Sequence, residues 1–137
     1  MNNRKTTLLL FVLLLCSALA HADPFQSAMD AYIAGNYQEA FRLFKEMAEQ
    51  GNPIAQSELG AMYASGMGVP EDDREAVAWY RRAAEQGDAM AQFNLGVMYK
   101  DGEGVPEDDK QAVTWFHKSA EQGYAPAQYN LGAVYAN

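Results

Sequence analysis

Two short acidic runs are the densest groups of side chains in this sequence that could bind a metal ion. Both read Pro-Glu-Asp-Asp, at residues 70–73 and 106–109. A calcium loop supplies about six to eight oxygen ligands at set positions. In the loop that starts at Asp101, however, Val105 stands where an oxygen ligand is needed, and no bidentate glutamate follows at the right distance. Acidic residues at a helix N-terminus also cap the helix and complement its dipole. We therefore interpret both runs as caps and expect neither a metal site nor a cofactor.

Histidine, cysteine and serine are scarce after residue 22. A catalytic or metal-binding histidine needs partner groups, and His117 has no second histidine or cysteine in this part of the sequence. No serine here is followed by lysine at the third position, as a Ser-x-x-Lys nucleophile requires. The Gly-x-Gly pairs at 66–68 and 102–104 lack the preceding strand and the lysine of a phosphate-binding loop. We therefore expect no catalytic residues, and the residue types disfavour a hydrolase.

All of these residues lie in a segment that the chain repeats. Residues 91–126 match residues 55–90 at 21 of 36 positions without a gap, and residues 127–137 begin a further copy. A fixed period between about 20 and 50 residues marks a repeat architecture. The sequence therefore predicts one repeated structural unit rather than a site built from scattered motifs.

The first half of each 36-residue unit is predicted to be a helix, which we call helix A. It runs from about residue 53 to 64 and, in the next copy, from about 89 to 100. Ala91, Leu95 and Tyr99 lie at positions i, i+4 and i+8, so they share one helix face. A glycine recurs in the middle of each helix A, where it costs about 1 kcal/mol relative to alanine. The glycines are Gly60, Gly96 and Gly132. We expect a neighbouring helix to approach closely there.

The second half of each unit is predicted to be helix B, which begins with a capping box. In this motif an Asp, Asn, Ser or Thr cap is followed three residues later by Glu or Gln. The pairs are Asp72 with Glu75, Asp108 with Gln111, and Asn36 with Glu39. The last pair belongs to a shortened first repeat at 25–54, whose connecting loop is five residues shorter. A final helix A is predicted over Ala125–Tyr135, and no strand pattern is present.

The first 22 residues are predicted to be a secretory signal peptide. A short basic region precedes an apolar run at 8–15, which is too short to span a bilayer. Residues 20–22 read Ala-His-Ala, with small residues at the two positions that a signal peptidase reads. Cleavage after Ala22 would leave a single domain at 23–137, periplasmic or secreted, without an integral membrane segment. The alternative is an uncleaved anchor.

The domain that remains after cleavage is strongly acidic. Two of the 10 basic residues lie in the signal segment, so 8 basic and 18 acidic residues remain and the net charge is about −10. A chain of this charge is repelled by nucleic acid and by anionic lipid. We therefore expect no nucleic-acid partner. The single cysteine, Cys16, also leaves with the signal, so the domain relies on its apolar core.

The repeated motifs carry a family resemblance. They read Ala-Gln-x-x-Leu-Gly-x-x-Tyr, Gly-x-Gly-Val-Pro, Ala-Val-x-Trp and Ala-Glu-Gln-Gly. Residues 55–137 resemble the Sel1-like repeat, a relative of the tetratricopeptide repeat, and residues 25–54 look closer to a plain tetratricopeptide unit. The resemblance implies an all-α fold, a right-handed α-solenoid of antiparallel helix pairs with helices A on its concave face. Such proteins are commonly adaptors, and exported bacterial members act in envelope complexes, signalling and host contact.

A stripe on helices A is the candidate partner-binding surface, because solenoids bind along their concave face. It lies opposite the Ala91–Leu95–Tyr99 face and combines aromatic or aliphatic anchors with side-chain amides. Its residues are Phe93, Asn94, Val97, Lys100, Tyr129 and Asn130. The alternative is that the two rings pack between neighbouring repeats.

Two functions are consistent with this sequence. The first is a non-catalytic protein–protein interaction module, an adaptor of the bacterial envelope or secreted space that binds a protein or peptide on its concave face. The second is a small inhibitor or immunity-type protein that blocks an exported enzyme or toxin, since the acidic charge suits a basic target.

Overall fold

The computed structural model describes residues 22–135, so the predicted signal peptide lies almost entirely outside the described residues. This part of the chain contains helices and no strand. The helices are α2 (Pro24–Ile33), α3 (Tyr37–Glu49), α4 (Pro53–Ser65), α5 (Asp73–Glu85), α6 (Ala89–Asp101), α7 (Asp109–Glu121) and α8 (Ala125–Tyr135). Helices A are α2, α4, α6 and α8, and helices B are α3, α5 and α7.

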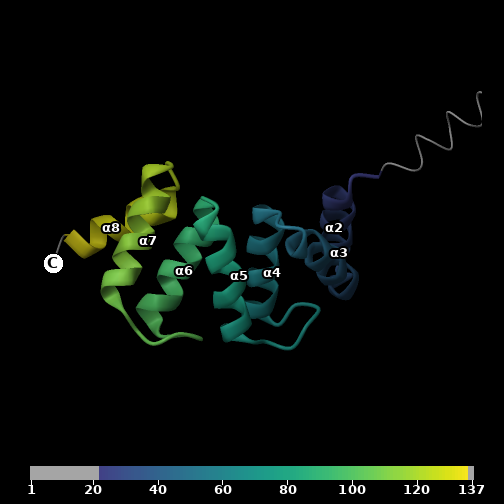
Figure 1. Cartoon of the computed structure of the whole chain (residues 1–137), viewed down its shortest axis with the longest axis horizontal. Helices are drawn as coiled ribbons and strands as arrows, with labels where there is room; N and C mark the ends of the chain where they lie inside the picture. Colours follow the sequence, from purple (N-terminus) through teal and green to yellow (C-terminus); the bar gives the residue numbers. More distant parts are fainter. Residues whose placement is uncertain (1–21, 136–137) are drawn as a thin grey trace, which may run out of the picture.

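The helices follow one another along the long axis of the molecule, from α2 and α3 at one end to α8 at the other (Figure 1). Each helix packs against the helix before it and the helix after it in the sequence. Among described helices that are not consecutive, α4 and α6 also touch, as successive helices A. This arrangement is an α-solenoid, and the predicted all-α fold of antiparallel helix pairs is confirmed.

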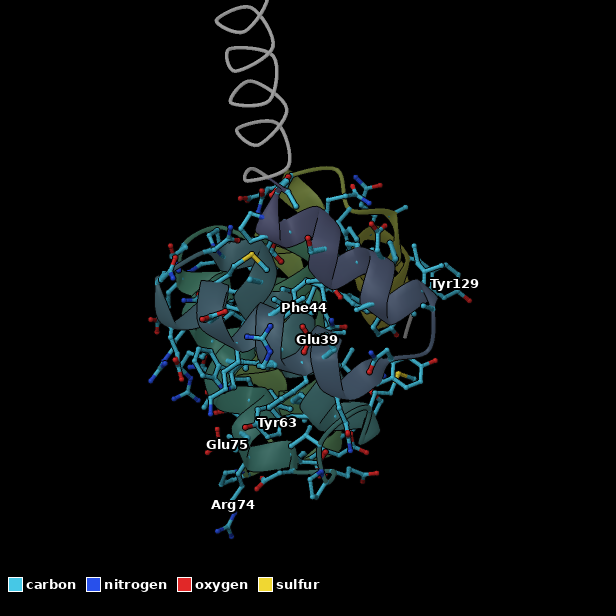
Figure 2. The ribbon with its side chains drawn as sticks, turned by 90° about the vertical axis from the view of Figure 1, so that its right-hand side faces the viewer. Glu39, Phe44, Tyr63, Arg74, Glu75 and Tyr129 are labelled. Carbon is cyan, nitrogen blue, oxygen red and sulfur yellow. The ribbon has the colours of Figure 1, made fainter. Side chains whose placement is uncertain are left out.

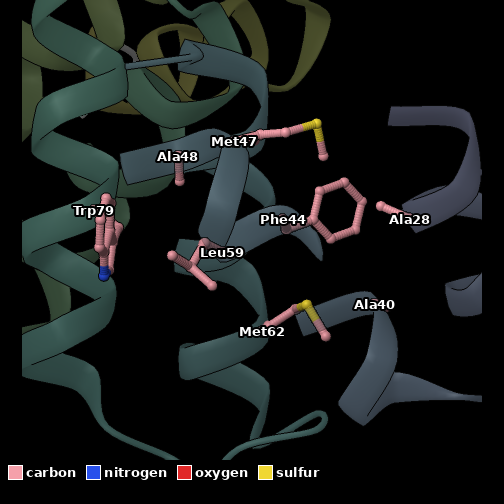
Figure 3. Close-up of a cluster of buried hydrophobic side chains, with 9 residues drawn as sticks. Ala28, Ala40, Phe44, Met47, Ala48, Leu59, Met62 and Trp79 are labelled. Carbon is pink, nitrogen blue, oxygen red and sulfur yellow. The ribbon is translucent and has the colours of Figure 1, made fainter. Parts of the chain in front are cut away.

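The core is divided into clusters that recur along the solenoid. An aromatic ring of helix B lies in each cluster, and the three rings are 36 residues apart: Phe44, Tyr80 and Phe116. In the first cluster the Phe44 ring points towards Ala28 of α2, while Trp79 of α5 closes the opposite side (Figure 3). Phe44 has no exposed surface, and burial of such a ring contributes about 1.5–3 kcal/mol.

Two mid-helix glycines allow helices A and B to approach one another. A Cβ atom at Gly60 would come within 2.8 Å of the Tyr80 ring, and one at Gly96 within 2.7 Å of the Phe116 ring. The predicted close approach is therefore confirmed at both positions. At Gly132 a Cβ atom would meet no described atom within 4 Å, so α8 has no such neighbour among the described residues.

Most of the predicted caps are present. Asp72 accepts hydrogen bonds from the backbone N–H groups of Arg74 and Glu75, and Asp108 caps α7 in the same way. The prediction was wrong at Asn36, whose side chain makes no cap hydrogen bond to α3. The reason is its backbone: ψ is 67° at Asn36 but 115° at Asn52, and the Asn52 side chain does cap α4. Tyr37 at the start of α3 instead packs edge to face on the Tyr32 ring.

A buried glutamine of helix A links each of two repeats to the repeat before it, in a way that the sequence did not reveal. Gln92 of α6 is buried; its amide donates to the Ala84 carbonyl oxygen at 3.1 Å and its own oxygen accepts from Gln122 at 2.8 Å. Gln56 makes the equivalent bonds one repeat earlier, to Ala48 and Gln86. Buried amides are stable in a core only when they are hydrogen-bonded. The bonds to Ala48 and Ala84 therefore tie helix A of one repeat to the end of helix B of the preceding repeat.

Candidate protein-binding surface

The predicted stripe on helices A contains residues with very different exposure. Phe93 of α6 is half-buried, and its ring lies 5.7 Å from the Phe116 ring and 5.5 Å from the Tyr124 ring. Val97, one turn later, is half-buried in the same cluster. Phe93 and Val97 thus contribute to packing between α6, α7 and the turn that leads into α8.

The other aromatic residue of the stripe is exposed. Tyr129 of α8 is 79% exposed, and Figure 2 shows its side chain projecting from the edge of the molecule. Lys100 in the last turn of α6 is also exposed, whereas Asn94 and Asn130 are half-buried. No ring contact joins Phe93 to Tyr129 in the part of the chain that the structure describes. Of the stripe, Tyr129 and Lys100 are therefore the side chains most accessible to a partner.

A second surface feature was not predicted. A pocket of about 540 Å³ opens between α3, the end of α4, the following loop and the start of α5. It is lined by Lys45, Tyr63, Val69, Pro70, Glu71, Asp72, Glu75 and Trp79. Aromatic and acidic side chains thus share one concave site. In Figure 2, Tyr63 and Glu75 lie close together on the side of the view opposite Tyr129.

The electrostatic environment of this pocket is negative. Burial raises the pKa of the Tyr63 hydroxyl above its usual value, and the nearby carboxylates of Glu75 and Asp72 raise it further. Burial disfavours any charge, but the part of this shift that comes from the carboxylates reflects a negative potential, which favours a cation. The pocket could have been recognised from the positions at which the repeats differ. Position 45 is lysine, whereas the equivalent position 81 is arginine. Position 75 is glutamate, whereas the equivalent position 111 is glutamine.

Metal and membrane features are limited in the described part of the chain. Residues 22–135 contain no group of three or more His, Cys, Asp or Glu side chains that could hold a metal ion. None of the helices in this range combines the length and the hydrophobicity that crossing a bilayer requires.

Sequence comparison matches four Sel1 repeats in the chain, at residues 30–52, 53–88, 89–124 and 125–137. The chain belongs to the Sel1 repeat family. The matched second and third Sel1 repeats start at the first residues of α4 and α6, two residues before the boundaries expected from the internal period. Sel1 repeat proteins generally mediate protein–protein interactions, and they are generally non-catalytic scaffolds.

Solved structures of Sel1 repeat proteins share this fold. A Sel1 repeat protein from Oxalobacter formigenes is 38% identical with a TM-score of 0.78, over 83% of this chain and 45% of that one. The protective antigen c5321 of uropathogenic Escherichia coli is 37% identical with a TM-score of 0.78, and the match covers 82% of this chain and 25% of that one. Cysteine-rich protein B of Helicobacter pylori is 30% identical with a TM-score of 0.63, and the match covers 66% of this chain and 68% of that one. The present chain therefore spans less than half the length of the first two proteins.

Proposed function

We propose that this protein is a non-catalytic adaptor that binds a protein or peptide along the surface formed by its helices A. The observation that carries the proposal is the exposure of Tyr129, at 79%, on the same stripe whose other ring, Phe93, is half-buried against the core. Exposed aromatic residues are common anchors of protein interfaces, because they bury a large area at little cost in side-chain entropy. Lys100 and the half-buried amides of Asn94 and Asn130 supply polar contacts beside this anchor.

The adaptor is proposed to act in the periplasm or outside the cell. The proposal rests on the N-terminal basic and apolar segments and on the Ala-His-Ala sequence at 20–22. Fractionation of expressing cells, followed by N-terminal sequencing of the soluble exported form, tests it. The expected first residue is Asp23, whereas a soluble cytoplasmic protein that retains residue 1 would contradict it.

A second role is favoured by the charge of the domain. With 8 basic and 18 acidic residues after position 22, its net charge of about −10 would attract a basic enzyme or toxin. Under this alternative the protein is an inhibitor or immunity-type protein of one exported target. Complementary charge mainly accelerates association, so the binding rate should fall steeply with salt.

Capture from an envelope extract separates these roles, with three forms of the protein as bait. The wild type is compared with Tyr129→Ala and with Ile33→Ala, a matched change at an exposed apolar residue near the other end of the solenoid. We expect the wild type and Ile33→Ala to retain an envelope-assembly component and Tyr129→Ala to lose it.

Two other outcomes would change the assignment. Capture of a single basic enzyme or toxin, whose activity falls when the domain is added, would support the inhibitor. Turnover of a small substrate by the purified domain, without a stable partner, would overturn both non-catalytic roles.

A further inference from the structure

Tyr63 and Tyr99 occupy the same position in consecutive repeats, but their hydroxyl groups have different surroundings. The Nη2 atom of Arg81 donates a hydrogen bond to the Tyr99 hydroxyl oxygen at 2.8 Å. Its guanidinium carbon lies 5.9 Å from the centroid of the Tyr99 ring. One copy of the repeat therefore holds a guanidinium group at its tyrosine, supplied by helix B of the preceding repeat.

At Tyr63 the corresponding cation is different. Position 45, which is 36 residues before Arg81, is a lysine, and its ammonium group lies 3.9 Å from the Glu49 carboxylate. Within residues 22–135 the Tyr63 hydroxyl has no hydrogen-bond partner. The pocket of about 540 Å³ lies beside this tyrosine. The site that Arg81 fills in the next repeat is thus open here.

The charge of the open pocket also differs from that of its filled counterpart. Three acidic residues and one basic residue line it: Glu71, Asp72, Glu75 and Lys45. The residues 36 positions later include two acids and one base: Glu107, Asp108, Gln111 and Arg81. The open pocket therefore has one more negative charge than the site in which a guanidinium group is already bound.

We propose that the pocket at Tyr63 receives an arginine side chain from a protein partner. The proposal rests on the proposed function in one respect, namely that the partner is a protein. A guanidinium group suits this site because it is planar, always charged, and able to donate to a hydroxyl and to carboxylates while it lies against an aromatic ring. The hydroxyl group and the ring of Tyr63 and the carboxylate of Glu75 offer these three kinds of contact. The ring of Trp79 also lines the pocket, but the guanidinium group of Arg82 already lies over it, 4.5 Å from its centroid. Arg81 forms two of them within this chain.

The pocket and the stripe of Tyr129 are separate surfaces. Tyr63 and Glu75 lie on one side of the view in Figure 2, and Tyr129 lies on the other. A partner that inserts an arginine at Tyr63 therefore contacts the ends of α4 and α5 rather than α8.

Binding of small arginine derivatives to the full domain, followed by NMR, tests the proposal. The probes are N-acetyl-arginine methylamide, the corresponding citrulline compound, which is neutral and of similar shape, the corresponding lysine compound, and free arginine. We expect the blocked arginine to shift the resonances of Tyr63 and Trp79 saturably, the lysine compound to bind more weakly, and the citrulline compound not to bind. Free arginine should bind no more tightly than the blocked compound.

The chain itself supplies the variants. Lys45→Arg places the residue of the next repeat at this position, so its own guanidinium should fill the pocket and abolish binding of the probe. Arg81→Lys should open a second site, with new shifts at Tyr99 and Trp115. Glu75→Gln, again the residue of the next repeat, should weaken binding by a factor of about two to five. Thermal melting followed by circular dichroism verifies that each variant is folded.

Several results would overturn the proposal. These are the absence of saturable shifts at Tyr63 in the folded wild type, equal binding of the citrulline or lysine compound, or unchanged binding by Lys45→Arg. Tighter binding of free arginine than of the blocked compound would assign the pocket to a small molecule instead of a protein. None of these results bears on the capture experiment with Tyr129→Ala, so failure of the pocket and failure of the adaptor role can be distinguished.

Discussion

Gly60 lies against the ring of Tyr80 so closely that a Cβ atom at residue 60 would come within 2.8 Å of that ring. Glycine is unfavourable in the middle of a helix, yet any side chain here would push α4 away from α5. We expect Gly60→Ala to lower the free energy of unfolding by about 1–3 kcal/mol, the usual cost of overpacking. Urea denaturation followed by circular dichroism measures this change.

Gly132 provides the matched control for this prediction. It occupies the same repeat position on α8, but a Cβ atom there would meet no described atom within 4 Å. Gly132→Ala should therefore stabilise the helix, by up to about 1 kcal/mol. Equal destabilisation by the two substitutions would contradict the role assigned to the contact between Gly60 and Tyr80.

Asn52 and Asn36 precede helices in the same way but differ in their hydrogen bonds. The Asn52 side chain accepts from the backbone N–H groups of Ile54 and Ala55, at 3.0 and 3.1 Å. We expect Asn52→Ala to cost about 1 kcal/mol, the typical value for loss of an N-cap. Asn36→Ala should cost much less, because Asn36 makes no cap bond. Thermal melting of the two variants tests the difference, which disappears if Asn36 caps α3 in solution.

The two rings of the candidate stripe should differ in what they contribute to stability. Phe93 is packed on the Phe116 and Tyr124 rings, so Phe93→Ala should lower the free energy of unfolding by about 2 kcal/mol, below the range for a fully buried ring. Tyr129 is 79% exposed, so Tyr129→Ala should change the free energy of unfolding by less than about 0.5 kcal/mol. Chemical denaturation of the single variants measures both values. A large loss at Tyr129 would remove it from the binding surface.

Glu58 of α4 is predicted to make stability depend on pH. Burial, together with the charge of Asp88, raises the pKa of the Glu58 carboxyl group in the folded protein. The folded chain then holds this proton more tightly than the unfolded chain, so the contribution of Glu58 to stability decreases as pH rises through the raised pKa. Glu58→Gln should therefore raise the free energy of unfolding at neutral pH, by less than about 1 kcal/mol, and change it little in acid.

Denaturation of Glu58→Gln and wild type at several pH values between acid and neutral tests this prediction. Glu103→Gln, a change at an exposed loop glutamate, serves as the control. A stability gain at Glu58→Gln that does not vary with pH would argue against a titration effect.

The fold was predictable from the sequence because identical positions in the copies are those that the repeated core uses. Leu59 and Leu95 have no exposed surface, and the glycine that follows each of them lies against a ring of helix B. The caps were predictable wherever the backbone before the helix is extended, as at Asp72. The prediction of a cap at Asn36 was wrong because ψ there is 67° rather than extended, and the spacing of residues in the sequence does not report that angle.

The candidate sites were harder to predict, for two physical reasons. The helical period places Phe93 on a face, but it does not say that Tyr124, from the turn after the next helix, will cover its ring. The pocket at Tyr63 depends on positions at which the copies differ, and a search for identical residues passes over Lys45 and Glu75. Aligned differences between repeats are therefore as informative about binding as identities are about the core.

The packing of each helix against its immediate neighbours has a kinetic consequence. Most contacts between helices join consecutive helices, which are close in the sequence. The protein therefore has a low contact order and should fold rapidly. Internal helices such as α5 pack extensively on both sides, whereas α2 and α8 each pack extensively on one described helix. In such a one-dimensional array, unfolding begins at the outer repeats and moves inwards. Amide hydrogens should accordingly exchange most slowly in the central helices α4 to α6, next to the pocket at Tyr63, and fastest around Tyr129.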